Sequence, residues 1–249
     1  MKSAVEITAM KGKEAIAMLT VYDYPTAVAL DSCGLDILFV GDSLAQNELG
    51  LKSTADIELD TMLHHLGAVS RGVSKTHLLA DLPYGSYATE ELALESAKRL
   101  LDSGANSVKL EGPRFGVVEH LVRHDIPVMA HVGLLPQTAK RYLRQGTKED
   151  SAARILRQAE RLVDAGCYAI VVEFMSHTTA RTITESVSVP TIGIGAGSDC
   201  DGQVLVITDM LGQHQKVPSY VRKFAHLYEA TAQAATQYRD EVKRRVFPS

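Results

Sequence analysis

The sequence predicts an α/β fold in which strands and helices alternate along the chain and close into a TIM-type (β/α)8 barrel. Eight short apolar runs are typical of buried strands, and helix-length segments separate seven of them. A length of 249 residues matches such a barrel folded as a single domain, which we therefore expect over residues 1–249.

The strands are expected at residues 15–21, 37–40, 78–82, 107–112, 127–132, 168–174, 190–194 and 202–208. The run Ile37–Val40 is apolar throughout, as in a parallel strand that helices cover on both faces. Helices are expected at residues 25–33, 60–72, 89–103, 117–124, 149–166 and 178–187, followed by a long C-terminal helix from 218 to about 247. Thr89 is the expected N-cap of its helix, because acidic residues fill the first turn after it. The polar stretch 44–54 is expected to be a loop that covers a site.

The composition favours a small-molecule partner. With 26 basic and 30 acidic residues and a formal net charge of −4, the chain lacks the positive charge typical of proteins that bind nucleic acid or an anionic membrane. No apolar run reaches the roughly 20 residues of a membrane span, and residues 1–13 lack the apolar core of a signal peptide. The three cysteines stand far apart, which argues against disulfides and a structural zinc site and indicates the cytoplasm.

Groups that can ligate a metal or ionise close most of the predicted strands. Because the C-terminal ends of all strands in a barrel open on one face, we expect these side chains to converge there. They are Asp23, Asp42, Asp81, Glu111, His131, Glu173 and Asp209. Carboxylates around one opening repel each other unless a cation is present, and oxygen ligands suit Mg²⁺. We expect Asp42 and Asp81 to ligate it, and Glu111 to do so directly or through water. The alternative for any one acid is a helix N-cap or a solvated loop position.

Three further features bear on substrate chemistry. Lys109 would point to the same side as Glu111 on a strand and could bind a substrate carboxylate, with a Schiff base or a structural ion pair with Glu111 as alternatives. Ser43 follows Asp42 and could donate to the same substrate. Glu173 ends an apolar strand and has no basic neighbour in the sequence, a setting that suits a proton-transfer base.

Two other patterns carry less weight. Residues 41–45 resemble the nucleophile elbow of hydrolases, but that motif needs a helix directly after the serine, and the residues that follow here are loop-like. Near the C-terminus, aromatic and aliphatic residues at helical spacing are expected to be core or subunit-contact residues. They are Tyr220, Phe224, Leu227 and Tyr228.

Six motifs make the sequence resemble the ketopantoate hydroxymethyltransferase family, in matching order and spacing from about residue 6 to Pro248. They are Leu19-Thr20-Val21-Tyr22-Asp23-Tyr24, Val40-Gly41-Asp42-Ser43-Leu44, Ala80-Asp81-Leu82-Pro83, Val108-Lys109-Leu110-Glu111-Gly112, His131-Val132-Gly133-Leu134-Leu135-Pro136-Gln137 and Ile192-Gly193-Ile194-Gly195-Ala196-Gly197. The resemblance implies a (β/α)8 barrel of the phosphoenolpyruvate/pyruvate superfamily that assembles as a homo-oligomer, typically a decamer. It also implies transfer of a hydroxymethyl group from 5,10-methylenetetrahydrofolate to 3-methyl-2-oxobutanoate, which gives 2-dehydropantoate on the pathway to pantothenate.

The resemblance implies a role for each candidate residue. The family's Mg²⁺ ligands match Asp42, Asp81 and Glu111, and the two aspartates also lie among the keto-acid contacts. The family's other contacts to the keto acid match Ser43, Lys109 and His131. Its proton acceptor matches Glu173.

Three stretches at the predicted barrel mouth depart from the family's usual sequence, namely residues 45–54, 139–146 and 174–176. They leave the folate side of the site and the size of the keto acid open. Two alternatives therefore stand beside the family reaction. One is a divergent Mg²⁺-dependent lyase or aldolase of the same superfamily, and the other is a non-catalytic barrel that binds a keto acid.

Overall fold

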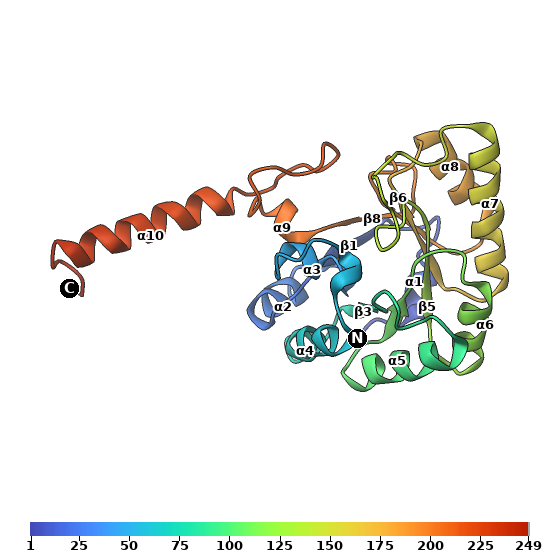
Figure 1. Ribbon diagram of the computed structural model, residues 1–249, viewed down its shortest axis with the longest axis horizontal. Helices are drawn as coiled ribbons and strands as arrows, with labels where there is room; N and C mark the ends of the chain where they lie inside the picture. Colours follow the sequence, from blue (N-terminus) through green and yellow to red (C-terminus); the bar gives the residue numbers. More distant parts are fainter. Residues whose placement is uncertain (249) are drawn as a thin grey trace. The chain divides into compact units, whose positions relative to one another are not determined.

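A computed structural model describes residues 1–248 (Figure 1). The chain forms two compact units, Met1–Val204 and Leu205–Ser249, and each is described by itself. The single domain over residues 1–249 stays a prediction.

The strands close into a barrel in chain order, from β1 to β8, and the neighbouring pairs along this order are parallel. Their bounds are β1 Ile16–Thr20, β2 Ile37–Val40, β3 His77–Asp81, β4 Ser107–Lys109, β5 Val128–Gly133, β6 Ala169–Glu173, β7 Thr191–Ile194 and β8 Gly202–Leu205. The ring is closed where the amide of Ile16 donates to the carbonyl of Asp201 at 3.0 Å. The predicted α/β class and the (β/α)8 barrel are confirmed.

Helices lie around the outside of the strands in the first unit (Figure 1). The longer ones are α2 Tyr24–Asp31, α4 Leu59–Ser70, α5 Glu90–Asp102, α6 Phe115–Arg123, α7 Glu149–Asp164 and α8 His177–Ser186. The predicted cap is confirmed, because the Thr89 side chain accepts from the amide of Leu92. Asp23 likewise caps α2 through the amide of Thr26, which is the structural alternative considered for any one acid.

Three short helices were not predicted, because four or five residues are too few to show a helical period. One of them, α9 Ile207–Met210, begins inside the strand that was predicted at 202–208, and the observed strand β8 ends earlier, at Leu205. Helix α1, Ala4–Thr8, has a capping box between Ser3 and Glu6 and buries Ile7 in the core cluster of the barrel. Helix α3, Leu44–Asn47, and a 3₁₀ turn at Thr54–Asp56 occupy much of the stretch that was predicted to be a loop. That loop prediction is therefore wrong in part.

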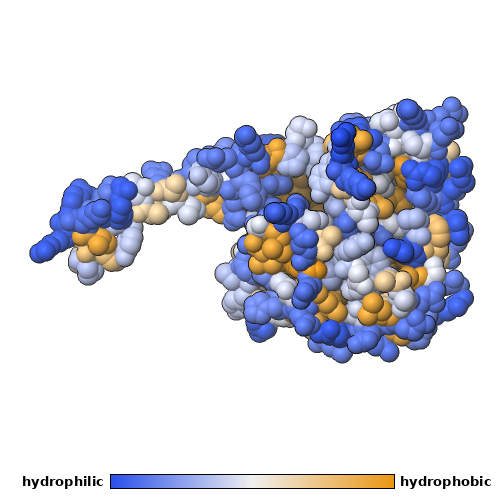
Figure 2. Space-filling model, in the orientation of Figure 1, coloured by the Kyte–Doolittle hydropathy of each residue, from blue (hydrophilic) through white to orange (hydrophobic). Residues whose placement is uncertain are grey.

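The second unit contains α9 Ile207–Met210 and α10 Leu227–Lys243. The predicted C-terminal helix starts nine residues late, because the amides of Phe224 and Leu227 donate to the carbonyls of Met210 and Leu211 instead of to a preceding helical turn. Phe224 and Tyr228 are exposed, so they are not core residues of this chain, and a subunit contact stays a prediction. In Figure 2 the surface of α10 is mainly hydrophilic, with a few apolar side chains among the polar ones. No helix among residues 1–248 is long and apolar enough to cross a membrane.

Candidate active site

The C-terminal ends of the strands bring the predicted site residues together. Asp81, Lys109 and Glu173 are the last residues of β3, β4 and β6, His131 lies on β5, and Asp42 follows β2. Glu111 lies two residues beyond β4, which ends earlier than predicted because the chain turns at Gly112, whose φ is +84°. Most of these side chains are buried, and the Glu173 side chain is the most accessible of the acids at 16% exposed.

A buried ion pair forms the centre of this site. Lys109 Nζ lies 2.6 Å from Asp81 Oδ1, and the backbone amide of Asp42 donates to Asp81 Oδ2 at 3.0 Å. The lysine therefore pairs with Asp81 rather than with Glu111, the ion-pair partner considered as an alternative to substrate binding. Both oxygens of Asp81 are held in place, which fixes the lysine at the mouth of the barrel.

Gln137 is a site residue that sequence reasoning missed. Its side-chain Nε2 donates to Asp42 Oδ2 at 2.7 Å, its backbone amide donates to Glu111 Oε2 at 3.1 Å, and its Oε1 accepts from the hydroxyl of Tyr87. One buried glutamine, through its side-chain and backbone amides, therefore holds two of the candidate metal ligands. The signals in the sequence were its place at the end of the motif that starts at His131 and its polar character directly after the mostly apolar run 132–136.

His131 lies against two carboxylates. Its Nδ1 is 3.6 Å from Glu111 Oε1 and its Nε2 is 3.4 Å from Glu173 Oε2. Neither ring nitrogen makes a well-formed hydrogen bond with any described residue. Burial lowers the pKa of His131 and so favours the neutral ring. A buried polar group without a partner is costly, and a bound ligand could supply the missing partner.

The electrostatics of the site favour bound positive charge. Burial, together with repulsion by Asp81, raises the pKa of Asp42 to about 7. Burial also raises the pKa of Glu111 well above its ordinary value, and the neighbouring carboxylates add to the effect. For Lys109, burial alone would lower the pKa, but Asp81 and the other carboxylates outweigh it and raise the pKa. One lysine therefore faces several acids, and a further cation would offset their repulsion.

The donor chemistry of the site fits Mg²⁺, although no three His, Cys, Asp or Glu side chains among residues 1–248 gather closely enough to hold a metal ion by themselves. Asp42, Asp81 and Glu111 offer only carboxylate oxygens, which hard cations prefer. Mg²⁺ in proteins commonly uses one or two carboxylates and completes its shell with water and substrate oxygens. A preformed cage of three protein ligands is therefore not required, and the ligand assignment stays a prediction.

Ser43 lies next to Tyr22 and begins the short helix α3. The two hydroxyl oxygens are 2.8 Å apart. A helix directly after the serine matches the nucleophile elbow, contrary to the loop that the sequence suggested. Among the hydrogen bonds of residues 1–248, however, the Ser43 hydroxyl is paired with Tyr22 and not with a histidine, so the described contacts show no catalytic triad.

Two of the stretches that depart from the family's usual sequence lie side by side. The amide of Gln145 donates to the carbonyl of Phe174, and the amide of Ser176 donates to the carbonyl of Gln145, both at 2.9 Å. Arg144 Nη1 donates to the carbonyl of Met175 at 2.7 Å, and its guanidinium lies 4.9 Å from the centre of the Phe174 ring. Residues 139–146 are thus anchored to the segment that directly follows Glu173.

The fold and this acidic site together define the class, a (β/α)8 barrel with a candidate active site at the C-terminal ends of its strands. Solved structures share the fold at low sequence identity. A phosphonopyruvate hydrolase in complex with oxalate and Mg²⁺ aligns with a TM-score of 0.67 at 13% identity, over 98% of this chain and 88% of that one. A 2,3-dimethylmalate lyase, described as a member of the PEP mutase/isocitrate lyase superfamily, aligns with a TM-score of 0.63 at 18% identity, over 100% and 90% of the two chains.

The chain belongs to the ketopantoate hydroxymethyltransferase family, whose sequence pattern matches residues 2–249. A 3-methyl-2-oxobutanoate hydroxymethyltransferase of Thermococcus kodakarensis is 46% identical over 98% of this chain and 88% of its own length. One from Thermotoga maritima is also 46% identical, over 96% of this chain and 92% of its own length. The predicted family and the class of enzyme, a hydroxymethyltransferase, are confirmed.

Proposed function

We propose that the protein transfers a hydroxymethyl group from 5,10-methylenetetrahydrofolate to 3-methyl-2-oxobutanoate and so forms 2-dehydropantoate for pantothenate biosynthesis. The names of the relatives support the keto acid. The observation that carries the proposal is the buried pair of Lys109 and Asp81 among further carboxylates. Such a site can bind an anionic keto acid while carboxylates remain available for a cation and for proton transfer.

Glu173 is the proposed base that removes the proton from C3 of the keto acid. Its carboxylate is the most accessible of the acids, and it lies 3.4 Å from the neutral ring of His131. The ring would orient the base and hydrogen-bond the substrate. Lys109 would offset the negative charge that develops on the keto acid as the proton leaves, and the hydroxyl of Ser43 would donate to the substrate.

Asp42 and Asp81, with Glu111 directly or through a water, would hold Mg²⁺. The chemistry that this ion supplies when bound is Lewis acidity toward the oxygens of the keto acid. Gln137 would keep the carboxylates of Asp42 and Glu111 in place through its two donated hydrogen bonds. The deprotonated carbon would then form a bond to the one-carbon unit of the folate, a water molecule would supply the oxygen of the new hydroxyl group, and tetrahydrofolate would leave.

The experiment is NMR of 3-methyl-2-oxobutanoate in D₂O with the enzyme and Mg²⁺, which follows loss of the C3 proton, with Glu173→Gln as the variant. We expect exchange that needs both Mg²⁺ and Glu173, and 2-dehydropantoate once methylenetetrahydrofolate is added. Exchange without product would favour a lyase or aldolase that uses another acceptor. No exchange under either condition would refute the role of Glu173 and favour a non-catalytic keto-acid-binding barrel.

We further propose a cytoplasmic homo-oligomer, a decamer by family resemblance. Three free cysteines and a formal net charge of −4 suit a reducing compartment without a nucleic-acid partner. The exposed apolar side chains of the second unit, among them Phe224 and Tyr238, suit a contact between subunits. Light scattering coupled to size-exclusion chromatography tests this, and a monomer would contradict it.

A further inference from the structure

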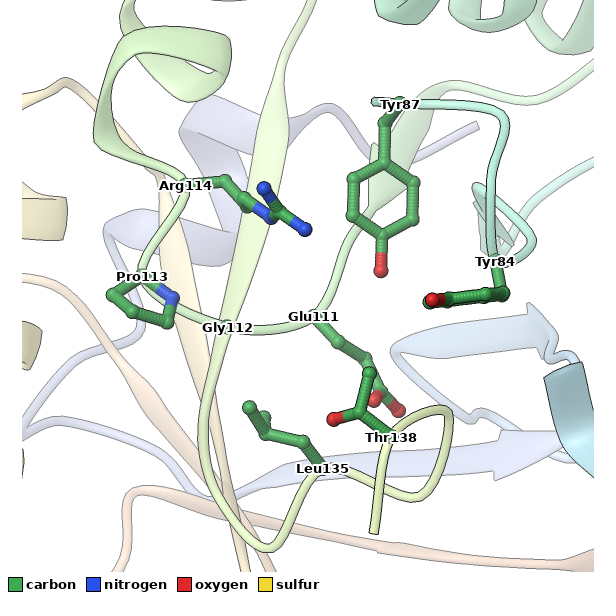
Figure 3. Close-up of a pocket in the computed structure, with 8 residues that line it drawn as sticks. All are labelled: Tyr84, Tyr87, Glu111, Gly112, Pro113, Arg114, Leu135 and Thr138. Atoms are coloured by element: carbon green, nitrogen blue, oxygen red, sulfur yellow. The ribbon is translucent and has the colours of Figure 1, made fainter. Parts of the chain in front are cut away.

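A cavity lies beside the acidic site. Its volume is about 230 Å³, and the loops that follow β3, β4 and β5 line it (Figure 3). The side chains that matter for its chemistry are Tyr84, Tyr87, Glu111, Arg114, Leu135 and Thr138. Figure 3 shows the Glu111 carboxylate between Thr138 and the two tyrosines, so the cavity reaches the edge of the acidic cluster.

This cavity is not the place where the keto acid would be held. Asp42, Asp81, Lys109 and Glu173 do not line it, and Glu111 is the one candidate site residue that does. A molecule in the cavity would therefore lie next to the keto acid and approach it past Glu111. In a reaction between two substrates, that is the position of the second substrate.

The lining indicates a flat molecule that carries hydrogen-bond acceptors or negative charge. Tyr84 is 50% exposed and can offer its ring as a stacking surface, and Leu135 adds an apolar wall. Arg114 has no carboxylate within 4 Å in residues 1–248, and its guanidinium lies 5.9 Å from the centre of the Tyr87 ring. The Arg114 guanidinium is planar, lies over an aromatic ring and has no acidic partner among residues 1–248, so it is suited to bind an oxygen of a ligand.

We propose that this cavity is the subsite for a flat ring of the one-carbon donor, a reduced folate, stacked on Tyr84 with Arg114 on its oxygens. The inference rests on the proposed function, because it takes the donor to be a folate. A volume of about 230 Å³ is below the 300 to 1,000 Å³ typical of a complete drug-sized ligand, so one ring system enters and the rest of the folate stays outside. Both the pterin and the aminobenzoyl-glutamate part contain a flat ring and oxygen acceptors, so the lining suits either part of the folate.

The test is calorimetric titration of the Mg²⁺-loaded enzyme with tetrahydrofolate under anaerobic conditions. Tyr84→Leu and Arg114→Gln are each expected to raise the Kd for tetrahydrofolate about tenfold and to raise the KM for methylenetetrahydrofolate in parallel. Matched controls are Tyr24→Leu, at a tyrosine that is 50% exposed like Tyr84 but does not line the cavity, and Arg123→Gln, at the other end of α6. Both controls are expected to bind as the wild type does.

Two further readouts distinguish a donor-side defect from misfolding and from a failure of the proposed function. C3 proton exchange of the keto acid needs no folate, so an unchanged exchange rate in Tyr84→Leu and Arg114→Gln shows that the variants are folded and that their defect lies on the donor side. Titrations with a tetrahydropterin and with aminobenzoyl-glutamate then identify which ring depends on Tyr84. An unchanged Kd for tetrahydrofolate in both variants, with a wild type that turns over, would overturn the subsite and leave the proposed function intact. A wild type that exchanges the C3 proton but binds no tetrahydrofolate would overturn both.

Discussion

Two buried aspartates show how differently the two ends of the barrel are built. Asp31 lies at the base and accepts hydrogen bonds from the amides of Ser74, Lys75 and Thr76 and from the hydroxyl of Ser74, at 2.8 to 3.1 Å. Burial pushes the pKa of Asp31 upward, but these hydrogen bonds outweigh it and leave the pKa well below its ordinary value. Asp42 at the mouth receives one hydrogen bond from Gln137, and its pKa is raised to about 7.

The two buried histidines of the barrel interior repeat this contrast. At the base, His77 Nδ1 lies 2.9 Å from the carbonyl of Lys2, and its Nε2 lies 2.7 Å from the hydroxyl of Ser107, which in turn contacts Tyr168 at 2.9 Å. At the mouth, neither nitrogen of His131 has such a partner. The difference teaches that the base is built for stability, because its polar groups are satisfied within the fold. The mouth retains unsatisfied groups that a ligand can use.

The largest expected effect comes from Asp42→Asn at the mouth. Catalysis should fall at least a hundredfold, about 3 kcal/mol, because a candidate cation ligand is lost. The free energy of unfolding should nevertheless rise by about 1 to 2 kcal/mol, because the buried repulsion with Asp81 is relieved. C3 proton exchange and denaturant unfolding measure the two effects. A loss of stability would contradict the comparison.

The stability gain of Asp42→Asn should also depend on pH. The pKa of Asp42 in the fold is about 7, above its ordinary 3.8, so the folded state binds the proton more tightly than the unfolded state does. The stability that this proton contributes is fully present below pH 3.8 and is lost as the pH rises through 7. The advantage of the variant should therefore grow over that window, and a constant difference would contradict the raised pKa.

The same substitution at the base, Asp31→Asn, should have the opposite effect on stability. We expect the free energy of unfolding to fall by about 2 to 3 kcal/mol. The NH2 group that replaces one carboxylate oxygen cannot accept hydrogen bonds, so donors in residues 74–76, directly before β3, would lose their partner. Catalysis should stay at the wild-type rate in the protein that remains folded. The matched control is Asp60→Asn, because the Asp60 side chain is 80% exposed and its ion pair with Arg99 should contribute less than about 1 kcal/mol. Equal losses in the two variants would refute the role of the base network.

Gln137→Met should have an intermediate effect at the mouth. It keeps the size of the side chain but removes the hydrogen bonds to Asp42 and from Tyr87. We expect turnover to fall about tenfold and the affinity for Mg²⁺, measured by calorimetry, to fall to a similar degree. The control is Gln158→Met on α7, which lies outside the site. Normal Mg²⁺ affinity in Gln137→Met would show that Asp42 does not need this partner.

The smallest expected effect concerns His77. Burial lowers the pKa of His77 below its ordinary 6.5, so its contribution to stability is present above pH 6.5 and is lost as the pH falls toward the folded-state value. His77→Gln should reduce the acid-induced loss of stability between about pH 7 and 5 by about 1 kcal/mol, as measured by urea unfolding. His131, whose pKa is also lowered by burial, contributes to the acid-induced loss of stability with the same sign, and this contribution should remain. An unchanged pH profile would show that His77 does not carry this dependence.

Sequence patterns predicted the barrel well, because strands that helices cover on both faces are recognisable as apolar runs such as Ile37–Val40. They missed α1, α3 and α9, whose few residues show no period, and they extended the last helix through residues that bond to the region of α9. The candidate acids were recognisable because each lies at or just after a strand end. Gln137 was not, because it contacts Asp42 across 95 positions of the chain, and no local pattern carries that information.

The contact between Arg144 and the segment after Glu173 has a consequence for protein engineering. Arg144 binds the carbonyl of Met175, an acceptor that every residue type provides, but its stacking needs the ring of Phe174. Phe174 also has a φ of +42°, a backbone conformation that few non-glycine residues adopt readily. A chimera that takes residues 139–146 from a homologue should therefore take residues 174–176 from the same homologue, because the two segments depend on each other's side chains and backbone conformation.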